Sequence, residues 1–141
     1  MQSEILKPIV ALVAWSLVML LWVLATRLPA MRAAGVDLSK LVGTKGADAD
    51  RALPPAIQWK AHNYNHLMEQ PTLFYAVCLT IALAGAGNGV SAPIAWAYVG
   101  LRVAHSLVQA TTNRVATRFV FFLLSSVALI ALTIVAMKAV F

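Results

Sequence analysis

The stretch from residue 8 to residue 26 reads PIVALVAWSLVMLLWVLAT, and it decides the fold class of this chain. No charged residue lies between Lys7 and Arg27. Since an α-helix rises about 1.5 Å per residue, this run can cross roughly 30 Å of hydrocarbon. The alternative is a cleaved signal peptide, which has an apolar core of about 7–15 residues and a small-residue cleavage site after it. Arg27 and Arg32 follow instead, so we expect a spanning helix over residues 8–26.

Three further spans are predicted from the gaps between charges. The charge-free stretch between Glu69 and Arg102 is too long for one helix, and GAGNGVSAP at residues 85–93 supplies a turn. TTNR at residues 111–114 supplies another, before a second long charge-free run. The sequence therefore predicts an all-α fold, an integral membrane four-helix bundle that forms one domain over residues 1–141. The expected spans are 8–26, 55–84, 93–112 and 115–138, with a polar connection over residues 27–54.

The composition agrees with a membrane protein. Hydrophobic residues make up 61% of the 141 residues and charged residues 11%, whereas soluble domains carry about a quarter charged residues. The net charge of +6 does not indicate a nucleic-acid partner, because the cations lie beside apolar runs. Membrane lipid headgroups or an anionic ligand are the better interpretation. Cys78, alone in an apolar run, is expected to be a packed hydrophobic residue.

The loop charges predict an orientation. The first connection holds most of the basic residues, Arg114 and Arg118 flank the third, and the second has no charge. The positive-inside bias then places the first and third connections in the cytoplasm and both termini outside. We expect a multi-pass protein of the cytoplasmic (inner) membrane if the source is bacterial, with the polar ends of the helices facing the cytoplasm.

A polar stripe begins the second predicted span. Gln58, His62, Asn65, His66 and Glu69 are spaced by three or four residues and so share one face of a continuous helix. One interpretation is structural, in which Glu69 pairs with an arginine and fixes the helices to one another. The other is a polar ligand site at the cytoplasmic end, which the number of polar residues favours.

A second polar face follows on the third span and the start of the fourth. Tyr98, Arg102, His105 and Gln109 are spaced by four, three and four residues, and Arg114 and Arg118 are four apart. A single intramembrane histidine is often a hydrogen-bonded packing residue, and an arginine at a span's end often reaches the interface. Beside Arg102, a ligand role for His105 is an equal alternative, and we favour that role for Arg118.

Other kinds of site are not indicated. His62 and His66 have a chelating spacing, but Glu69 is a lone carboxylate and there is no cysteine pair, so we expect no metal site. The sequence also has no glycine-rich phosphate loop and no serine nucleophile elbow.

Two blocks of sequence resemble a known family. NHLMEQPTLFYAV at residues 65–77 and GLRVAHSLVQATTNRVATRF at residues 100–119 are similar to the MAPEG family, the membrane-associated proteins in eicosanoid and glutathione metabolism, and the pattern is closest to its bacterial-type members. The resemblance implies a homotrimer of four-helix subunits that binds glutathione between neighbouring subunits near the cytoplasmic face. Family enzymes use the glutathione thiolate for transfer, isomerisation or reduction of lipid hydroperoxides, and non-catalytic relatives present lipids to a partner enzyme.

The resemblance also assigns residues. Glu69 matches the family's helix-two glutamate, Arg102 and His105 match its helix-three pair, and Arg118 matches the arginine that stabilises the thiolate in the prostaglandin-synthase branch. The chain departs from the family at several positions. His62, Asn65 and His66 stand where the enzymes have an arginine and an arginine–asparagine pair, Gln109 replaces a tyrosine, and Phe119 replaces a small hydroxyl residue. Histidine and asparagine cannot bind a carboxylate with two parallel hydrogen bonds as arginine does, so two of the family's usual contacts with glutathione are weakened here and prostaglandin E synthesis is not the expected reaction.

Our leading hypothesis is a glutathione-dependent membrane transferase or peroxidase that acts on a lipophilic electrophile or a lipid hydroperoxide. Arg118 is the expected catalytic residue. The expected glutathione-binding residues are Lys60, His62, Asn65, His66, Glu69, Tyr98, Arg102, His105, Gln109 and Arg114. The alternative is a non-catalytic lipid-binding or scaffold protein of the same family. A small transporter or channel fits less well, because the polar groups gather at one end of the spans instead of lining a path.

Overall fold

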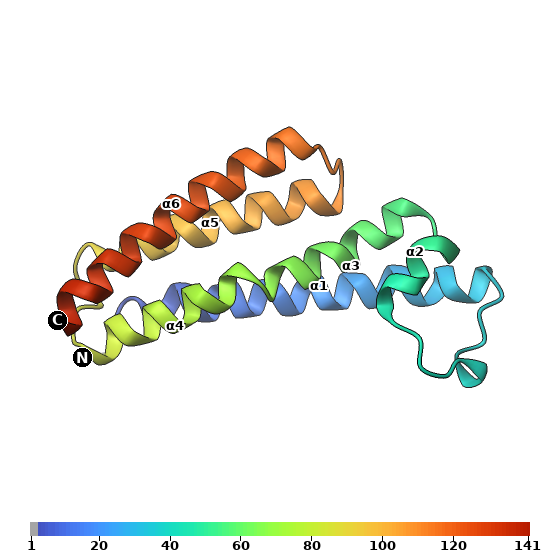
Figure 1. Ribbon diagram of the computed structural model, residues 1–141, viewed down its shortest axis with the longest axis horizontal. Coiled ribbons are helices and arrows are strands. Elements are labelled where there is room, and N and C mark those ends of the chain that lie inside the picture. Colours follow the sequence, from blue (N-terminus) through green and yellow to red (C-terminus); the bar gives the residue numbers. More distant parts are fainter. Residues whose placement is uncertain (1–2) are drawn as a thin grey trace.

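The computed structural model describes residues 3–141, and within them every regular element is helical. The predicted all-α class is confirmed. The long helices run side by side and give an elongated molecule (Figure 1). The elements are α1 (Leu6–Ala33), η1 (Leu38–Lys40), η2 (Gly46–Asp48), α2 (Ala49–Ala52), α3 (Pro55–Leu67), α4 (Gln70–Leu83), α5 (Ser91–Ala110) and α6 (Val115–Val140).

Helix α1 is apolar on its inner face and on its outer face. Its buried positions are spaced by three or four residues, as expected for one stripe of a helix: Pro8, Leu12, Ser16, Met19 and Val23. Large apolar side chains on the other faces are exposed, for example Val10 and Leu21 at 66% and 65%. Helix α6 repeats this pattern, with exposed Val127 and Ile130.

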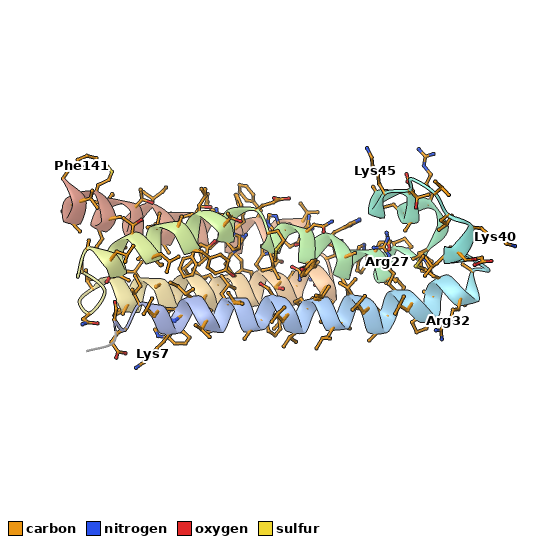
Figure 2. The ribbon with its side chains drawn as sticks, turned by 90° about the horizontal axis from the view of Figure 1, so that it is seen from below. Lys7, Arg27, Arg32, Lys40, Lys45 and Phe141 are labelled. Atoms are coloured by element: carbon orange, nitrogen blue, oxygen red, sulfur yellow. The ribbon has the colours of Figure 1, made fainter. Side chains whose placement is uncertain are left out.

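Helices that are apolar all round belong in a large core or in a membrane. In the described part of the chain, α1 and α6 are the helices long and apolar enough to cross a bilayer. Helix α1 extends seven residues past the predicted span end, from Arg27 to Ala33. Basic residues cluster at this end of the molecule, where Figure 2 labels Arg27, Arg32, Lys40 and Lys45.

The second predicted span is divided into α3 and α4 at Met68–Glu69, a difference from the continuous helix expected over residues 55–84. Pro71 explains the division, because proline has no N–H for the carbonyl of Leu67 and its ring would clash with that carbonyl. The last amides of α3 bond back only three residues, Met68 to Asn65 and Glu69 to His66. Glu69 itself adopts φ −86° and ψ −96°, outside the helical region. The break therefore lies at the acidic residue that the sequence singled out.

The connections place the chain ends together. Gly85, with φ +75°, ends α4, and the amide of Ala86 bonds the carbonyl of Ile81 beyond it. The N-terminal segment is tied to this same turn, since the amide of Ile5 donates to the carbonyl of Gly87 at 3.1 Å. Both termini lie at this end, and the α1–α3 and α5–α6 connections lie at the opposite end (Figure 1).

Candidate functional site

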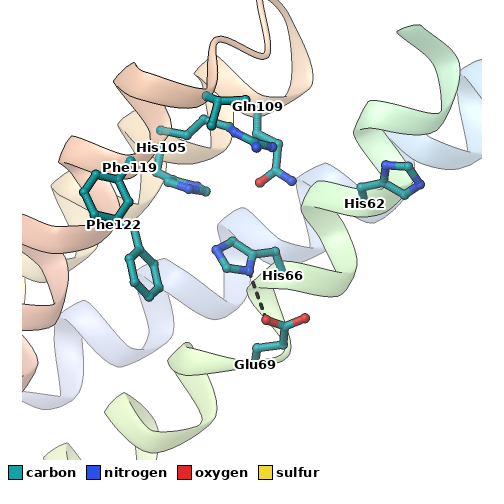
Figure 3. Close-up of a pocket in the computed structure, with 9 residues that line it drawn as sticks. His62, His66, Glu69, His105, Gln109, Phe119 and Phe122 are labelled. Carbon is teal, nitrogen blue, oxygen red and sulfur yellow. Dashed lines mark hydrogen bonds and ion pairs between the residues drawn. The ribbon is translucent and has the colours of Figure 1, made fainter. Parts of the chain in front are cut away.

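A cavity of about 450 Å³ opens between α3 and the α5–α6 pair, toward the end of the molecule where α5 and α6 are joined. Figure 3 shows its residues. Helix α3 and the break after it contribute one wall, and α5 and α6 contribute the other. The lining residues are His62, His66, Glu69, His105, Gln109, Val115, Arg118, Phe119 and Phe122.

Helical spacing explains why these side chains meet. His105 and Gln109 are four residues apart on the inward face of α5, and both are buried. On α6 the lining positions are separated by three, one and three residues, so they too form one face. The cavity thus has aromatic side chains, Phe119 and Phe122, beside the cation Arg118.

Two histidines face each other across the cavity wall. The rings of His66 and His105 have centroids 4.9 Å apart, and the ring of Phe122 lies 6.0 Å from that of His66. His66 Nδ1 lies 3.1 Å from the carboxylate of Glu69, which fixes the orientation of the ring (Figure 3). A histidine oriented by a carboxylate presents its other nitrogen in a defined direction.

An ion pair between Glu69 and an arginine, which was one interpretation of the sequence, is not found in the described part of the chain. Within residues 3–141, Glu69 forms no ion pair with an arginine, and its partner is His66. The break at Pro71 turns the glutamate outward, and its side chain is 68% exposed. The pairing of Glu69 with an arginine, one of the two alternatives for this residue, is therefore absent from the described chain.

Arg102 is the most unusual residue near the cavity. It is only 1% exposed, and none of its three guanidinium nitrogens has a hydrogen-bond partner among the described residues. The guanidinium carbon lies 5.9 Å and 6.0 Å from the ring centroids of Tyr98 and Phe122. A desolvated cation without hydrogen bonds is costly, so this positive charge directly behind Phe122 favours an anion nearby.

Further unpaired polar atoms lie on the same side. Gln109 Oε1 and Arg118 Nε are both buried without a partner in the described chain. Buried polar groups are nearly always hydrogen-bonded in native proteins. Arg102, Gln109 and Arg118 together therefore offer donors and one acceptor to a polar ligand.

Five of the predicted site residues do not line the cavity: Arg102, which lies behind its wall, and Tyr98, Lys60, Asn65 and Arg114. Tyr98 is buried in the core, stacks on Phe74 at 4.3 Å and donates to Gln70. Lys60 bonds the carbonyl of Ala110, where a cation complements the C-terminal end of α5. Asn65 and Arg114 are exposed on the surface.

His62 reaches only the edge of the cavity, because its ring is turned toward the first connection (Figure 3). There His62 Nε2 lies 2.9 Å from Asp50 Oδ1, and Gln58 Nε2 donates to the same oxygen at 2.6 Å. The hydrogen bonds from Gln58 and His62 hold the pKa of Asp50 below its usual value. Asp50 thus fastens the connection to the start of α3.

A second polar cluster, which was not predicted from the sequence, joins α3, α4, α5 and α6. Gln70 donates to Ser126 at 2.8 Å and accepts from Tyr98 at 3.2 Å, so it joins α4, α5 and α6. Asn63 donates to Ser106 at 2.5 Å and joins α3 to α5. The signal for Gln70 was its place in an apolar span next to a proline.

Residues 3–141 contain no group of three His, Cys, Asp or Glu side chains that is placed to hold a metal ion.

Comparison with known proteins adds one finding. The model of the MAPEG family matches residues 5–138, nearly the whole chain, so the match includes both halves of the cavity. No curated protein and no solved structure matches the chain.

Proposed function

The chain belongs to the MAPEG family, and from that premise we propose that it is a glutathione-dependent membrane transferase or peroxidase acting on a lipophilic electrophile or lipid hydroperoxide. The family is membrane-associated and glutathione-related, and it includes both enzymes and non-catalytic members. The observation that carries the proposal is the cavity in which Arg118 and Gln109 have unpaired buried atoms, with the buried charge of Arg102 behind its wall.

The cavity is compatible with a tripeptide anion. Its volume of about 450 Å³ lies within the range of about 300–1,000 Å³ that is usual for small-molecule sites. Glutathione carries two carboxylates and one ammonium group. The cations Arg102 and Arg118 attract the carboxylates and the thiolate, and the exposed carboxylate of Glu69 is available to the ammonium group.

Arg118 has the catalytic role in this proposal. A free thiol has a pKa near 8.5 and is mostly protonated at neutral pH. A guanidinium in a partly dry cavity favours the thiolate, because opposite charges attract more strongly where the dielectric is low. The thiolate sulfur then attacks the electrophilic carbon, a carbon–sulfur bond forms, and the leaving group departs with its electron pair.

With a hydroperoxide, the thiolate attacks the terminal oxygen and the O–O bond breaks. The products are a sulfenic acid and, after the alkoxide takes up a proton, an alcohol. A second glutathione then gives the disulfide and water. Phe119 and Phe122 provide an apolar surface for the lipid part of either substrate.

We also propose how the chain lies in the membrane. Helices α1, α5 and α6, with α3 and α4 together, form four crossings, and the basic α1–α3 connection faces the cytoplasm by the positive-inside rule. The cavity then opens toward the cytoplasm, and both termini lie outside. A homotrimer brings the exposed Asn65, Glu69 and Arg114 of one subunit toward its neighbour, so each complete site is shared between subunits.

Binding and turnover test the proposal. Calorimetry in detergent should show heat on adding millimolar glutathione, and Arg118→Ala and Glu69→Gln should weaken it. Lys138→Ala is the matched control, because it removes an exposed cation from the far end of the same helix. Conjugation of a dinitrobenzene electrophile should be steady in the wild type and lost in Arg118→Ala. No heat in the wild type rejects glutathione binding.

A non-catalytic lipid-binding protein is the second candidate. It is favoured by the cavity wall on α3, where histidines stand in place of the arginines expected of the enzymes, and by the turn of Glu69 away from the cations. Retention of a lipid or of glutathione without any conjugation or peroxidase turnover would support this candidate over the enzyme.

A further inference from the structure

A second cavity, of about 320 Å³, lies at the same end of the molecule but between α1 and the connection that follows it. The proposed function does not use it. Most of its wall is apolar, and its charged members are Arg27, Lys45 and Asp48. The lining residues are Arg27, Met31, Val36, Leu38, Leu41, Thr44, Lys45, Gly46, Asp48, Ala49, Ala52 and Leu53.

Polar contacts hold this cavity in shape. Arg27 Nη2 donates to the carbonyl of Gly46 at 2.9 Å and so ties α1 to the connection. The carboxylate of Asp48 accepts from the backbone amide of Lys45 at 2.7 Å, which turns its charge toward the backbone. These contacts fix the connection as one wall of the cavity. Arg27 is the cation between this wall and α1 (Figure 2).

The charge of this region is positive and largely unpaired. Residues 27–60 contain six Lys and Arg residues and three Asp residues, an excess of three positive charges. Lys40 pairs with Asp37, and no other lysine or arginine of this region forms an ion pair within residues 3–141. Arg27, Arg32, Lys45 and Arg51 have no carboxylate partner within residues 3–141.

The position of the cavity along α1 indicates which layer of the membrane lies beside it. The charge-free run of α1 ends at Thr26, and the helix continues for seven residues to Ala33. At 1.5 Å per residue, the extension reaches about 10 Å beyond the hydrocarbon, which covers the headgroup layer of one leaflet. Arg27 and Met31 of this extension line the cavity, exposed Leu38 and Leu41 line it from the connection, and the neighbouring Val42 is exposed outside the lining.

We propose that this cavity is a binding site for an anionic phospholipid of the surrounding membrane. The lipid phosphate pairs with the free donors of Arg27, with Lys45 at the rim, and the first part of one acyl chain lies along Met31, Leu38 and Leu41. Cationic side chains beside apolar ones at headgroup depth match the two halves of such a lipid. The site is separate from the one proposed for glutathione.

The test is lipid retention in a neutral detergent, measured by native mass spectrometry. The protein is exchanged into detergent with equal amounts of phosphatidylglycerol and phosphatidylcholine. We expect phosphatidylglycerol to remain bound preferentially. Arg27→Gln should lower its retention about tenfold or more, because a hydrogen bond to a charged group is lost, and Arg27→Lys should restore part of it.

Two matched controls separate a site from general attraction. Arg32→Gln removes the same charge from the same helix, but Arg32 does not line the cavity. Leu41→Asn should weaken retention, whereas Val42→Asn, at an adjacent exposed position outside the lining, should not. Equal losses for Arg27→Gln and Arg32→Gln, or no preference for the anionic lipid in the wild type, would overturn the proposal. Glutathione conjugation, measured on the same samples, should be unchanged by Leu41→Asn.

Discussion

Replacing Arg102 by methionine should make the ligand-free protein more stable, although it removes a residue at the centre of the fold. Arg102 is 1% exposed, and its guanidinium nitrogens have no hydrogen-bond partner in the described chain. Methionine fills a similar volume without a charge. The perturbation therefore removes an uncompensated buried cation and leaves the packing around Tyr98 and Phe122 nearly intact.

The expected change in the free energy of unfolding follows from two opposing contributions. Replacing buried ionic groups by apolar side chains of similar size is often neutral or stabilising by about 1–4 kcal/mol. The arginine recovers part of its desolvation cost from the faces of Tyr98 and Phe122, about 0.5–2 kcal/mol for a cation beside aromatic rings. We therefore expect Arg102→Met to raise the free energy of unfolding by about 2 kcal/mol in the absence of ligand.

The assay is equilibrium unfolding in mixed micelles, with and without glutathione. At a glutathione concentration of about 100 times its Kd, the wild type should gain about 2.7 kcal/mol, whereas Arg102→Met should gain nothing. The order of stability then reverses. Arg118→Met serves as the control, because Arg118 is partly exposed, and its ligand-free stability should change by less than about 0.5 kcal/mol.

The opposite result would refute this reasoning. If Arg102→Met lowers the ligand-free stability by 1 kcal/mol or more, the guanidinium has a partner that the single chain does not supply, such as a carboxylate of a neighbouring subunit. Cross-linking of the same sample would then identify that partner.

Three further outcomes are expected. Gln70→Ala should lower stability by about 2 kcal/mol, since it leaves the buried hydroxyl of Tyr98 without its partner, and Ser126→Ala should cost about 1 kcal/mol, both measured by the same unfolding titration. The low pKa of Asp50 means that its bonds to Gln58 and His62 contribute fully above about pH 4, its unfolded value, and are lost as the pH falls through the lower folded pKa. The protection of amides 49–58 from hydrogen exchange, taken relative to an unfolded chain at the same pH, should fall in acid and should already be low at pH 7 in Asp50→Asn. Pro71→Ala should restore a continuous helix. The new amide at position 71 should then be protected from hydrogen exchange, and glutathione affinity should fall as Glu69 rotates. An unchanged affinity would show that the break is not needed for binding.

Much of the architecture was accessible from local patterns. Runs without charge located α1 and α6. The glycine-rich turn at residues 85–93 located the end of α4 and the start of α5, and TTNR at residues 111–114 located the end of α5. All of these features depend on residues that are neighbours in sequence. Three of the residues that line the cavity from α5 and α6, His105, Gln109 and Arg118, are among those predicted from the sequence, since a face of an uninterrupted helix is fixed by its 3.6-residue period.

The stripe on the second span was only partly correct, and the reason is geometric. His62, His66 and Glu69 line the cavity, but Asn65 precedes His66 by one residue and therefore lies about 100° from it around α3. Asn65 is exposed, and it is Asn63 that lies inside. The bond from Asn63 to Ser106 joins residues 43 positions apart, and no local pattern contains such a pairing.

The α5–α6 hairpin bears on how the chain is inserted during synthesis. Helix α6 has no charge between Arg118 and Lys138, whereas α5 carries Arg102, His105 and Gln109 on its buried face. An arginine at the centre of a lone segment costs about 2.5–3.5 kcal/mol on translocon-based scales, so α5 emerging from the ribosome by itself prefers water to lipid. The turn at residues 111–114 lets α6 fold back against it at once. In the proposed four-crossing arrangement, we expect the two segments to enter the bilayer as one unit, and a nascent chain that stops before α6 to leave α5 outside the membrane.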